Sequence, residues 1–459
     1  MSELLLAYYA DDLTGATDAL EQLACAGVQA ALFLEPPDEQ ALQRLPGLQA
    51  IGVAGATRAL GEAALEAELR PAFAKLNALR PRHLHYKVCS TFDSSPAHGS
   101  IGRALEIARE AFQPRLTAVL GGSPPLGRYC VFGNLFATAN VAGGGAAHRL
   151  DRHPSASRHP TTPMTESDLR RLLAQQSNLG VELFDVTQWT RAAGEQVACL
   201  EQLLADGAEA VLFDALDTTH LESFGALIDH WADGESPVVS IGSSGVETAL
   251  CRHWSATGTI GQATQWPAAG AGLLLVGSGS CSPVTAAQID WAVGHGFGEV
   301  ALDAPALLAG DDDAVITQAT EQATAHLRGG RNVVVHLAKG PNDERIRSTR
   351  RLAEAKSHPG GGTGDEVTAV LGRSLGRLID QCLQQTATSR VCLAGGDTSS
   401  FAARELGIQA LELASPASPG APWCRAWAPG RDADQIEFNF KGGQVGTEAF
   451  FGLLASGQN

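Results

Sequence analysis

Two adjacent acidic side chains near the amino terminus are the first residues whose types and positions could do chemistry. Asp11 and Asp12 follow the apolar run 4–9 and precede residues with the apolar spacing of a helix. Such a run is typical of a buried parallel strand, which delivers its last residues to the ligand-binding edge of an α/β sheet. Capping of the following helix by Asp12 or Thr14 is the alternative, but it accounts for one of these residues and not for the acidic pair.

Basic side chains follow two further strand-like runs of the same region. Arg58 comes shortly after one of them, and Lys87 closes another. If these strands are parallel, both cations reach the edge that carries Asp11 and Asp12. Arginine binds a carboxylate through two hydrogen bonds and aspartate accepts from hydroxyl groups, so this edge would suit a sugar acid. A rim of structural ion pairs is the alternative for any one of these residues.

Three glycine-rich segments of the second half precede helical patterns. They are Gly277–Pro283, Ala394–Ser400 and Lys441–Gly446. Small residues let backbone amides approach an anion, and a helix start adds free N–H groups and the positive end of a dipole. A tight structural turn is the alternative for any one segment. No Gly-x-x-x-x-Gly-Lys-Ser/Thr occurs, so this is not a P-loop protein.

We expect the three segments to form one nucleotide site. Its predicted residues are Ser278, Gly279, Ser280, Gly395, Gly396, Asp397, Thr398 and Gly443.

Strand-like runs alternate with helical patterns along both halves, which predicts the α/β class. A chain of 459 residues exceeds what one core usually organises. A stretch rich in Gly, Ala, Thr and Pro separates the halves, so we predict a substrate-binding domain over 1–256, a linker over 257–271 and a nucleotide-binding domain over 272–459. Each domain would be a mostly parallel, Rossmann-like sheet with helices on both faces, and the site would lie in the interdomain cleft.

Composition excludes several classes of protein. The formal net charge of -17 argues against nucleic acid and anionic membranes, which are bound through excess Lys and Arg. The nine cysteines are scattered without a Cys-x-x-Cys pair, so neither a disulfide framework nor a zinc site is indicated. No basic leader and no apolar run of 18 residues occurs, so we expect a cytoplasmic protein.

Two groups of histidines need a separate interpretation. His83 and His85 would share one face of a strand, but no third ligand is apparent, which favours a structural role over a metal pair. The segment 142–163 is rich in Gly, Pro, Arg and His and is the one clearly basic stretch of the chain. It is interpreted either as a solvated surface loop or as a lid that meets phosphate or carboxylate.

The motifs resemble those of the four-carbon acid sugar kinases, which phosphorylate threonate, erythronate or 3-oxo-tetronate with ATP. Asp-Asp-Leu-Thr-Gly-Ala at 11–16 resembles their opening motif, and Lys-Val-Cys-Ser-Thr-Phe-Asp-Ser at 87–94 resembles the 3-oxo-tetronate branch. Matches at 99–102, 127–128, 133–136 and 159–165 follow in order, and the three glycine-rich segments resemble the family's ATP-associated ones. The similarity thus covers nearly the whole chain.

The resemblance implies ATP as phosphate donor, with Mg²⁺ to bridge its phosphates and Asp397 to hold the metal through water. It implies a sugar site comprising Asp11, Asp12, Thr14, Gly15, Arg58, Lys87, Ser90, Asp93, Arg128 and Asn134. By its position, Asp12 is our candidate for the general base, and Asp11 would hold a second hydroxyl or the helix start. Family members usually carry His where this chain has Asn134, and the stretch 137–152 also departs from their pattern.

The predicted reaction is transfer of phosphate from ATP to 3-oxo-tetronate, giving the 4-phosphate. A kinase for a branched sugar such as 3-oxo-isoapionate, or for threonate or erythronate, is the alternative. An NAD-linked oxidoreductase would need Gly-x-Gly-x-x-Gly after the first strand, where this chain has Asp-Asp-Leu-Thr-Gly. A non-catalytic acid-sugar sensor would not need the ATP segments. We expect small-molecule partners only, and a homodimer is left open.

Overall fold

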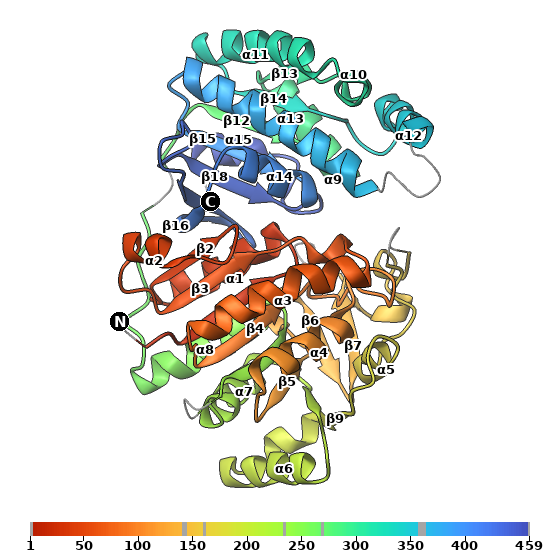
Figure 1. Ribbon diagram of the computed structural model, residues 1–459, viewed down its shortest axis with the longest axis vertical. Helices are drawn as coiled ribbons and strands as arrows, with labels where there is room; N and C mark the ends of the chain where they lie inside the picture. Colours follow the sequence, from red (N-terminus) through yellow and green to blue (C-terminus); the bar gives the residue numbers. More distant parts are fainter. Residues whose placement is uncertain are drawn as a thin grey trace. The chain divides into compact units, whose positions relative to one another are not determined.

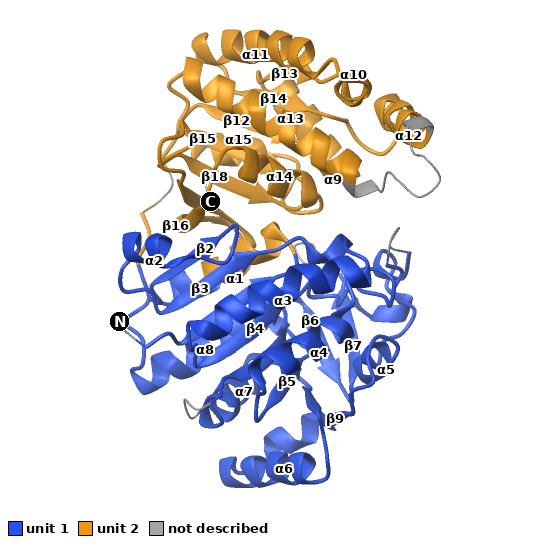
Figure 2. Ribbon diagram, viewed as in Figure 1, with its two compact units in different colours: residues 1–11, 22–264 blue, residues 12–21, 265–459 orange. Residues whose placement is uncertain are grey.

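The computed structural model describes residues 3–139, 145–158, 162–232, 236–267, 270–356 and 364–457. The chain forms two compact units, coloured in Figure 2. Unit 1 comprises residues 1–11 and 22–264, and unit 2 comprises residues 12–21 and 265–459. The short segment 12–21 therefore counts with unit 2, whereas the sequence-based prediction assigns it to the first domain. The limits 1–256 and 272–459 stay predictions.

Unit 1 is built on a sheet whose described strand pairs are all parallel (Figure 1). In spatial order its strands are β2 (Ala30–Phe33), β3 (Ala50–Ala54), β1 (Leu6–Ala10), β4 (His83–Lys87), β11 (Val238–Gly242), β5 (Thr117–Leu120), β10 (Ala210–Phe213) and β9 (Val181–Phe184). Because the strands run the same way, the residues that follow β1, β3, β4, β5 and β11 come to one edge.

Helices cover both faces of this sheet. They are α2 (Glu39–Arg44), α3 (Glu62–Ala78), α4 (Ile101–Phe112), α5 (Leu169–Ala174), α6 (Ala193–Ala205), α7 (Thr218–His230) and α8 (Gly245–Thr257), whereas most of α1 (Leu13–Cys25) counts with unit 2. Tyr9 and Tyr86 point to the face of α3, where they pack on Phe73. His83 points to the opposite face, where it meets Trp254 of α8. The alternation of strand side chains thus divides the core into two layers.

A small antiparallel sheet is added to unit 1. It consists of β6 (Arg128–Val131), β7 (Asn134–Thr138) and β8 (Ala147–Arg149). The β6–β7 turn places Phe132 at φ 49° and Gly133 at φ 79°. Two successive positive φ angles are the signature of a tight hairpin turn of the kind that twists with its strands.

The strands of unit 2 pair in a mixed, mostly parallel arrangement. Its parallel part runs β13 (Gly298–Ala301), β14 (Val333–His336), β12 (Leu274–Ser278), β15 (Arg390–Ala394) and β18 (Glu437–Lys441). The antiparallel strands β17 (Ala421–Trp427) and β16 (Ala410–Ser418) follow in that order. Its helices are α9 (Pro283–Gly294), α10 (Ala304–Ala309), α11 (Asp312–Arg328), α12 (Glu344–Lys356), α13 (Gly364–Gln385), α14 (Asp397–Glu405) and α15 (Phe450–Ser456).

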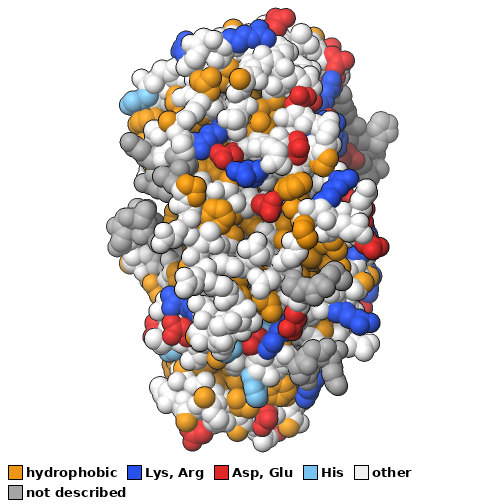
Figure 3. Space-filling view, turned by 90° about the vertical axis from the view of Figure 1, so that its left-hand side faces the viewer, with side chains coloured by type: hydrophobic (Ala, Val, Ile, Leu, Met, Phe, Trp, Pro, Cys, Tyr) orange, Lys and Arg blue, Asp and Glu red, His pale blue; other side chains and the backbone are white. Residues whose placement is uncertain are grey.

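The structure confirms the coarse prediction of a two-part α/β protein with a large, mostly parallel sheet. Among the described residues, no helix is both long and apolar enough to cross a membrane. On the face drawn in Figure 3, acidic and basic side chains are interspersed rather than gathered into a patch of one sign.

Candidate functional site

Asp11 and Arg58 form an ion pair at the edge of the unit 1 sheet. Asp11 is 4% exposed, and its carboxylate accepts from Arg58 Nη2 at 2.7 Å and from Arg58 Nε at 3.1 Å. The backbone holds this arrangement because the Asp11 amide donates to the Lys87 carbonyl and the Arg58 amide donates to the Asp11 carbonyl. Such a bidentate pair fixes both side chains in orientation. The guanidinium charge that the sequence-based prediction assigned to a substrate carboxylate is therefore already matched by Asp11.

Asp12, counted with unit 2, lies at the start of α1. Its Oδ1 accepts from the Gly15 amide at 2.7 Å, and its Oδ2 accepts from Thr14 Oγ1 at 2.8 Å. Thus Asp12 does cap the helix, as the alternative interpretation has it. Each carboxylate oxygen has two lone pairs, so capping leaves acceptor capacity for a hydroxyl group. The free amides of the first turn also favour the ionised form that a base needs.

Other predicted sugar-site residues lie near the end of β4. Arg128 Nε donates to Ser90 Oγ at 3.2 Å. Burial lowers the pKa of Arg128, whereas the nearby Cys89 and Asp93 act in the opposite direction. Lys87 is 3% exposed, and its ammonium donates to the Val88 carbonyl at 3.2 Å.

Asn134 makes hydrogen bonds at both ends of its amide. Its Oδ1 accepts from Ser167 Oγ at 2.9 Å, and its Nδ2 donates to the Phe132 carbonyl at 3.1 Å. Asp214 holds the turn before it, accepting from the Phe132 amide at 2.5 Å and the Gly133 amide at 2.9 Å. Burial raises the pKa of Asp214. Sequence reasoning missed Asp214, because it follows an apolar strand with no motif around it.

His83 and His85 have structural partners. His83 Nε2 lies 2.9 Å from Asp229 Oδ1, and His85 Nδ1 lies 2.6 Å from Glu247 Oε1. No group of three or more His, Cys, Asp or Glu side chains suited to a metal occurs in the described part of the chain. The two hydrogen bonds are what a structural role of these histidines requires.

The basic segment 142–163 is described in part. Residues 142–144 and 159–161, with His159, lie outside the described residues. Arg149 pairs with Asp151 at 2.6 Å. The Nδ1 atom of His153 accepts from the Ala156 amide at 3.1 Å, and burial lowers the pKa of this histidine.

The three glycine-rich segments lie against one another in unit 2. The Gly279 amide donates to the Ala394 carbonyl, and the Gly395 amide donates to the Lys441 carbonyl. A β carbon on Gly279 would lie 2.5 Å from Thr398 Oγ1. One on Gly443 would lie 2.8 Å from Ser280 Oγ. These contacts explain two of the glycines as packing requirements, because any side chain would force the segments apart.

Two other residues of these segments have features that a ligand could use. A β carbon on Gly396 would meet no atom within 4 Å. Ser278 is 0% exposed, and its hydroxyl has no hydrogen-bond partner among the described residues. A buried hydroxyl without a partner costs about 1 to 3 kcal/mol, so a ligand that supplies one is favoured.

Lys441 is a buried cation beneath the third segment. It is 0% exposed, and its ammonium donates to Thr285 Oγ1 at 3.1 Å and to the Gly442 carbonyl at 2.9 Å. Burial lowers its pKa to about 8. No carboxylate in the described ranges forms an ion pair with it, which leaves a positive charge without a protein counter-ion. Lys441 is the first residue of the third glycine-rich segment, but it is not among the residues predicted for the site.

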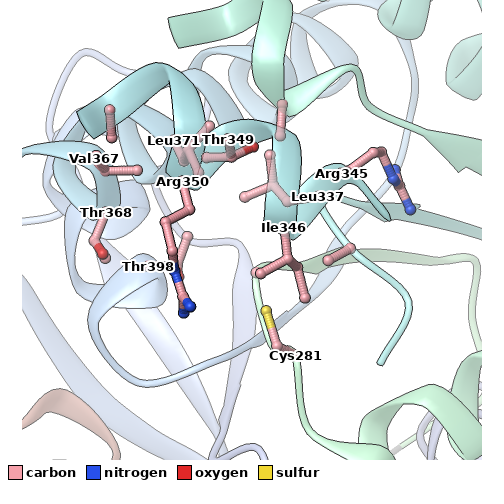
Figure 4. Close-up of a pocket in the computed structure, with 14 residues that line it drawn as sticks. Cys281, Leu337, Arg345, Ile346, Thr349, Arg350, Val367, Thr368, Leu371 and Thr398 are labelled. Atoms are coloured by element: carbon pink, nitrogen blue, oxygen red, sulfur yellow. The ribbon is translucent and has the colours of Figure 1, made fainter. Parts of the chain in front are cut away.

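A pocket of about 330 Å³ adjoins these segments (Figure 4). Its walls are mostly apolar, and Arg350 of α12 extends toward Thr398 while Arg345 turns away to bind Asp343 at 2.6 Å. The hydroxyl of Thr349 in the wall is buried without a partner among the described residues. The lining residues are Gly279, Cys281, Ala304, Leu337, Ala338, Arg345, Ile346, Thr349, Arg350, Ala353, Val367, Thr368, Leu371 and Thr398. An apolar pocket next to glycine-rich segments that can bind an anion suits a nucleoside with attached phosphates.

Family comparisons assign a class to each half of the chain. Residues 6–250 match the model of a sugar-binding N-terminal domain, and residues 275–451 match that of a nucleotide-binding C-terminal domain. The chain belongs to the four-carbon acid sugar kinase family. It is an ATP-dependent kinase that acts on an acid sugar, which sets aside the oxidoreductase and sensor alternatives.

Among curated relatives, 3-oxo-isoapionate kinase of Paraburkholderia graminis is 41% identical over 458 residues, which cover 99% of this chain and 95% of the relative. A 3-oxo-tetronate kinase of Methylobacterium radiotolerans is 31% identical and covers 98% of each chain.

Solved structures share the fold. A protein of Salmonella typhimurium described as a putative tRNA synthase aligns over 98% of each chain with a TM-score of 0.74 and 24% identity. The Haemophilus influenzae protein HI1011 aligns over 98% of each chain with a TM-score of 0.70 and 23% identity. At these identities the similarity concerns the fold.

Proposed function

We propose that the substrate is a branched 3-oxo acid sugar of the 3-oxo-isoapionate type. The observation that carries this is the 41% identity to a 3-oxo-isoapionate kinase, against 31% for the 3-oxo-tetronate kinase above. Asn134 and the altered stretch 137–152 are further reasons to prefer a substrate that differs from 3-oxo-tetronate. The 3-oxo-tetronate predicted from the motifs becomes the second candidate.

The sugar would bind at the carboxyl edge of the unit 1 sheet, in Rossmann-like fashion. The pair of Asp11 and Arg58 and the neighbouring Lys87 supply acceptors and positive charge there, and Ser90, Asp93 and Arg128 extend the polar surface. Thr14 and Gly15 act by holding Asp12. The predicted place of the reaction, an interdomain cleft, stays a prediction.

In the reaction, a hydroxyl oxygen of the sugar would form a bond to the γ-phosphorus of ATP while the bond from that phosphorus to the bridging oxygen breaks. ADP leaves with the electron pair, and Asp12 would receive the hydroxyl proton. Phosphoryl transfer depends mainly on alignment and charge neutralisation. The protein therefore needs to supply only one carboxylate, within hydrogen-bond distance of the nucleophile, as the proton acceptor.

ATP would bind unit 2 with its adenosine in the 330 Å³ pocket and its phosphates on the glycine-rich segments. The residues in contact would be those predicted from the sequence, Ser278–Ser280, Gly395–Thr398 and Gly443, and we add Arg350 of the pocket wall and the charge of Lys441 to them.

Magnesium would be carried by the nucleotide itself. Mg²⁺ in such enzymes keeps several waters and binds few protein ligands. Asp397, the first residue of α14, would hold the hydrated ion and help to neutralise the phosphate charge.

An ADP-release assay over 3-oxo-isoapionate, the 3-oxo-tetronates, threonate and erythronate tests the substrate. We expect the highest kcat/KM for 3-oxo-isoapionate. A higher kcat/KM for a 3-oxo-tetronate would restore the first candidate, and no turnover of any acid would refute the proposed reaction.

For the nucleotide site, Gly396→Val should raise the Kd for ATP at least about tenfold, because its side chain would occupy the space open to a ligand. The matched control is Gly294→Val, since a β carbon there also meets no atom within 4 Å and Gly294 lies at the end of α9. Equal ATP binding by the two variants would contradict this site.

A further inference from the structure

Two serine- and glycine-rich loops meet at the carboxyl edge of the unit 1 sheet. One loop follows β5 and contains Gly122 and Ser123, and the other joins β11 to α8 through residues 242–245. The strands are paired in register, with Gly242 opposite Leu120. A β carbon on Gly245 would lie 3.0 Å from the Gly122 carbonyl oxygen and 3.2 Å from Ser123 Oγ, so the second loop lies directly against the first.

The start of α8 has hydrogen-bond donors that the protein does not use. Among the described residues, no acceptor is found for the amides of Ser243, Ser244 and Gly245. The Ser244 side chain, although at the N-cap position, makes no capping bond. Free amides at the start of a 13-residue helix attract an anion, both as donors and through the dipole.

Buried hydroxyl groups at the same place give an independent indication of a ligand. Ser123 and Ser244 are each 2% exposed, and Ser243 is 4% exposed. None of these hydroxyl groups has a hydrogen-bond partner in the part of the chain that the structure describes. The Ser123 hydroxyl faces the first residue of α8, as its distance to a β carbon on Gly245 indicates. These side chains are almost wholly buried, so a ligand bound between the two loops could pair hydroxyl groups that the protein leaves without an acceptor.

The surrounding charge favours an anion. Glu247 in the first turn of α8 would oppose one, but it lies 2.6 Å from His85 Nδ1, and His85 Nε2 donates to the Gly242 carbonyl. The His85 ring thus links one oxygen of Glu247 to the Gly242 carbonyl, whereas the other oxygen, Oε2, is buried without a partner among the described residues. Lys87, the in-register neighbour of Gly242 on β4, adds a buried cation.

We propose that the amides of Ser243, Ser244 and Gly245, together with the hydroxyl of Ser123, bind the carboxylate of the acid sugar. The proposal rests on the proposed function and adds to it the group that recognises the acid. It moves this role away from Arg58, whose guanidinium is held bidentately by Asp11. We call these residues the carboxylate cradle.

The test compares the acid with its own primary amide. On whichever acid of the panel the wild-type enzyme phosphorylates best, Gly245→Ala should lower kcat/KM about 100-fold, because its methyl group would press on the Gly122 carbonyl and the Ser123 hydroxyl and so displace the two loops of the cradle. The milder Ser123→Ala should lower it about tenfold. With the amide as substrate both variants should lose less than about threefold, and the Kd for ATP should not change. Ser255→Ala, on an exposed position near the other end of α8, is the matched control.

Equal losses on acid and amide would overturn the cradle, since a site for the transferred phosphate, or a merely structural role, would affect both substrates alike. Full activity of Ser123→Ala on the acid would also overturn it, and this variant needs no rearrangement to fold. If the wild-type enzyme turns over no acid, the proposed function fails and the cradle fails with it. If the wild type is active but the variants lose as much activity on the amide as on the acid, the proposed function stands and only the cradle is refuted.

Discussion

The ligand-binding edges of the two units differ in how their charges are balanced. In unit 1 the cation Arg58 is paired with Asp11, and Arg128 lies near Asp93. In unit 2 the glycine-rich segments surround Lys441, for which the described residues supply no counter-ion. A balanced edge suits a small sugar with a single charge, which it selects by geometry. An edge with surplus positive charge suits the polyanionic phosphates of ATP, which complete its charge balance.

The largest expected effect concerns Asp12, which directly follows the paired Asp11 in the sequence. Asp12→Asn keeps the shape and the capping acceptor but removes the charge that would receive the hydroxyl proton. We expect kcat to fall roughly 100-fold or more while acid sugar and ATP still bind. Turnover measured with saturating substrates checks this. A correctly folded Asn variant with near-normal kcat would eliminate Asp12 as the base and leave Asp93 or Asp397 as candidates.

Arg58→Ala tests the balanced charge of unit 1. Removing the guanidinium leaves the buried Asp11 carboxylate without this partner. We therefore expect kcat/KM for the acid sugar to fall roughly 30-fold, which corresponds to a loss of about 2 kcal/mol in transition-state stabilisation. The Kd for ATP should change little. As a control, Arg70→Ala removes an arginine from exposed ion pairs, for which we expect no effect. Equal weakening of sugar and nucleotide binding by Arg58→Ala would contradict the division between the edges.

Lys441→Met tests the surplus charge of unit 2. The pKa of Lys441, lowered to about 8 by burial, means that its charge is present near pH 7 and lost as the pH rises through 8. Bound phosphates would raise this pKa, so ATP binding at about pH 8 to 8.5 should take up a proton. Titration calorimetry in buffers of different ionisation enthalpy measures that uptake. We expect the Met variant to lose it and to bind ATP roughly tenfold more weakly at about pH 7. Wild-type binding without proton uptake would contradict the role of Lys441.

The smallest expected effect concerns Glu21, in the segment 12–21 that counts with unit 2. Glu21 accepts from the Gly420 amide at 3.1 Å, and burial raises its pKa to about 7. Because the folded-state pKa lies above the unfolded one, the stability contributed by protonated Glu21 is present below pH 4.5 and is lost as the pH rises through 7.

Glu21→Gln keeps the neutral form at every pH. It should therefore raise the melting temperature at about pH 8, by an amount that corresponds to about 2 kcal/mol, and have little effect at about pH 4.5. Thermal unfolding at the two pH values checks the sign. Stabilisation at the acidic pH and none at the alkaline pH would contradict the burial of an ionisable Glu21 against the β16–β17 turn.

The sequence predicted the parallel strands well because their apolar runs are short and lie between turn-forming residues. The run 4–9 became β1, and the strand-like runs that precede Arg58 and end at Lys87 became β3 and β4. The antiparallel elements were missed for physical reasons. The β6–β7 hairpin turns at Phe132–Gly133, without the Asn-Gly or Asp-Gly pair that marks such turns. Strand β16 carries Pro416, which argues against a central strand.

The candidate sites were predictable where chemistry and local sequence coincide. Glycine-rich segments between strands and helices can be recognised from the sequence alone, and so can the two adjacent aspartates. The sequence could not indicate that Arg58 and Asp11, 47 residues apart, would pair with each other. Nor could it indicate that the Gly-Ser-Ser-Gly loop at 242–245 has unused donors, because that depends on the tertiary contact with Ser123.

The central claim is that the sugar carboxylate edge lies in unit 1 and the nucleotide segments lie in unit 2, and binding titrations on two variants test it most directly. We expect Arg58→Ala to weaken binding of the acid sugar at least about tenfold while the Kd for ATP stays within about twofold of the wild-type value. We expect Gly396→Val to show the reverse pattern. If either variant weakened both ligands to the same extent while remaining folded, the assignment of one ligand to each unit would be contradicted.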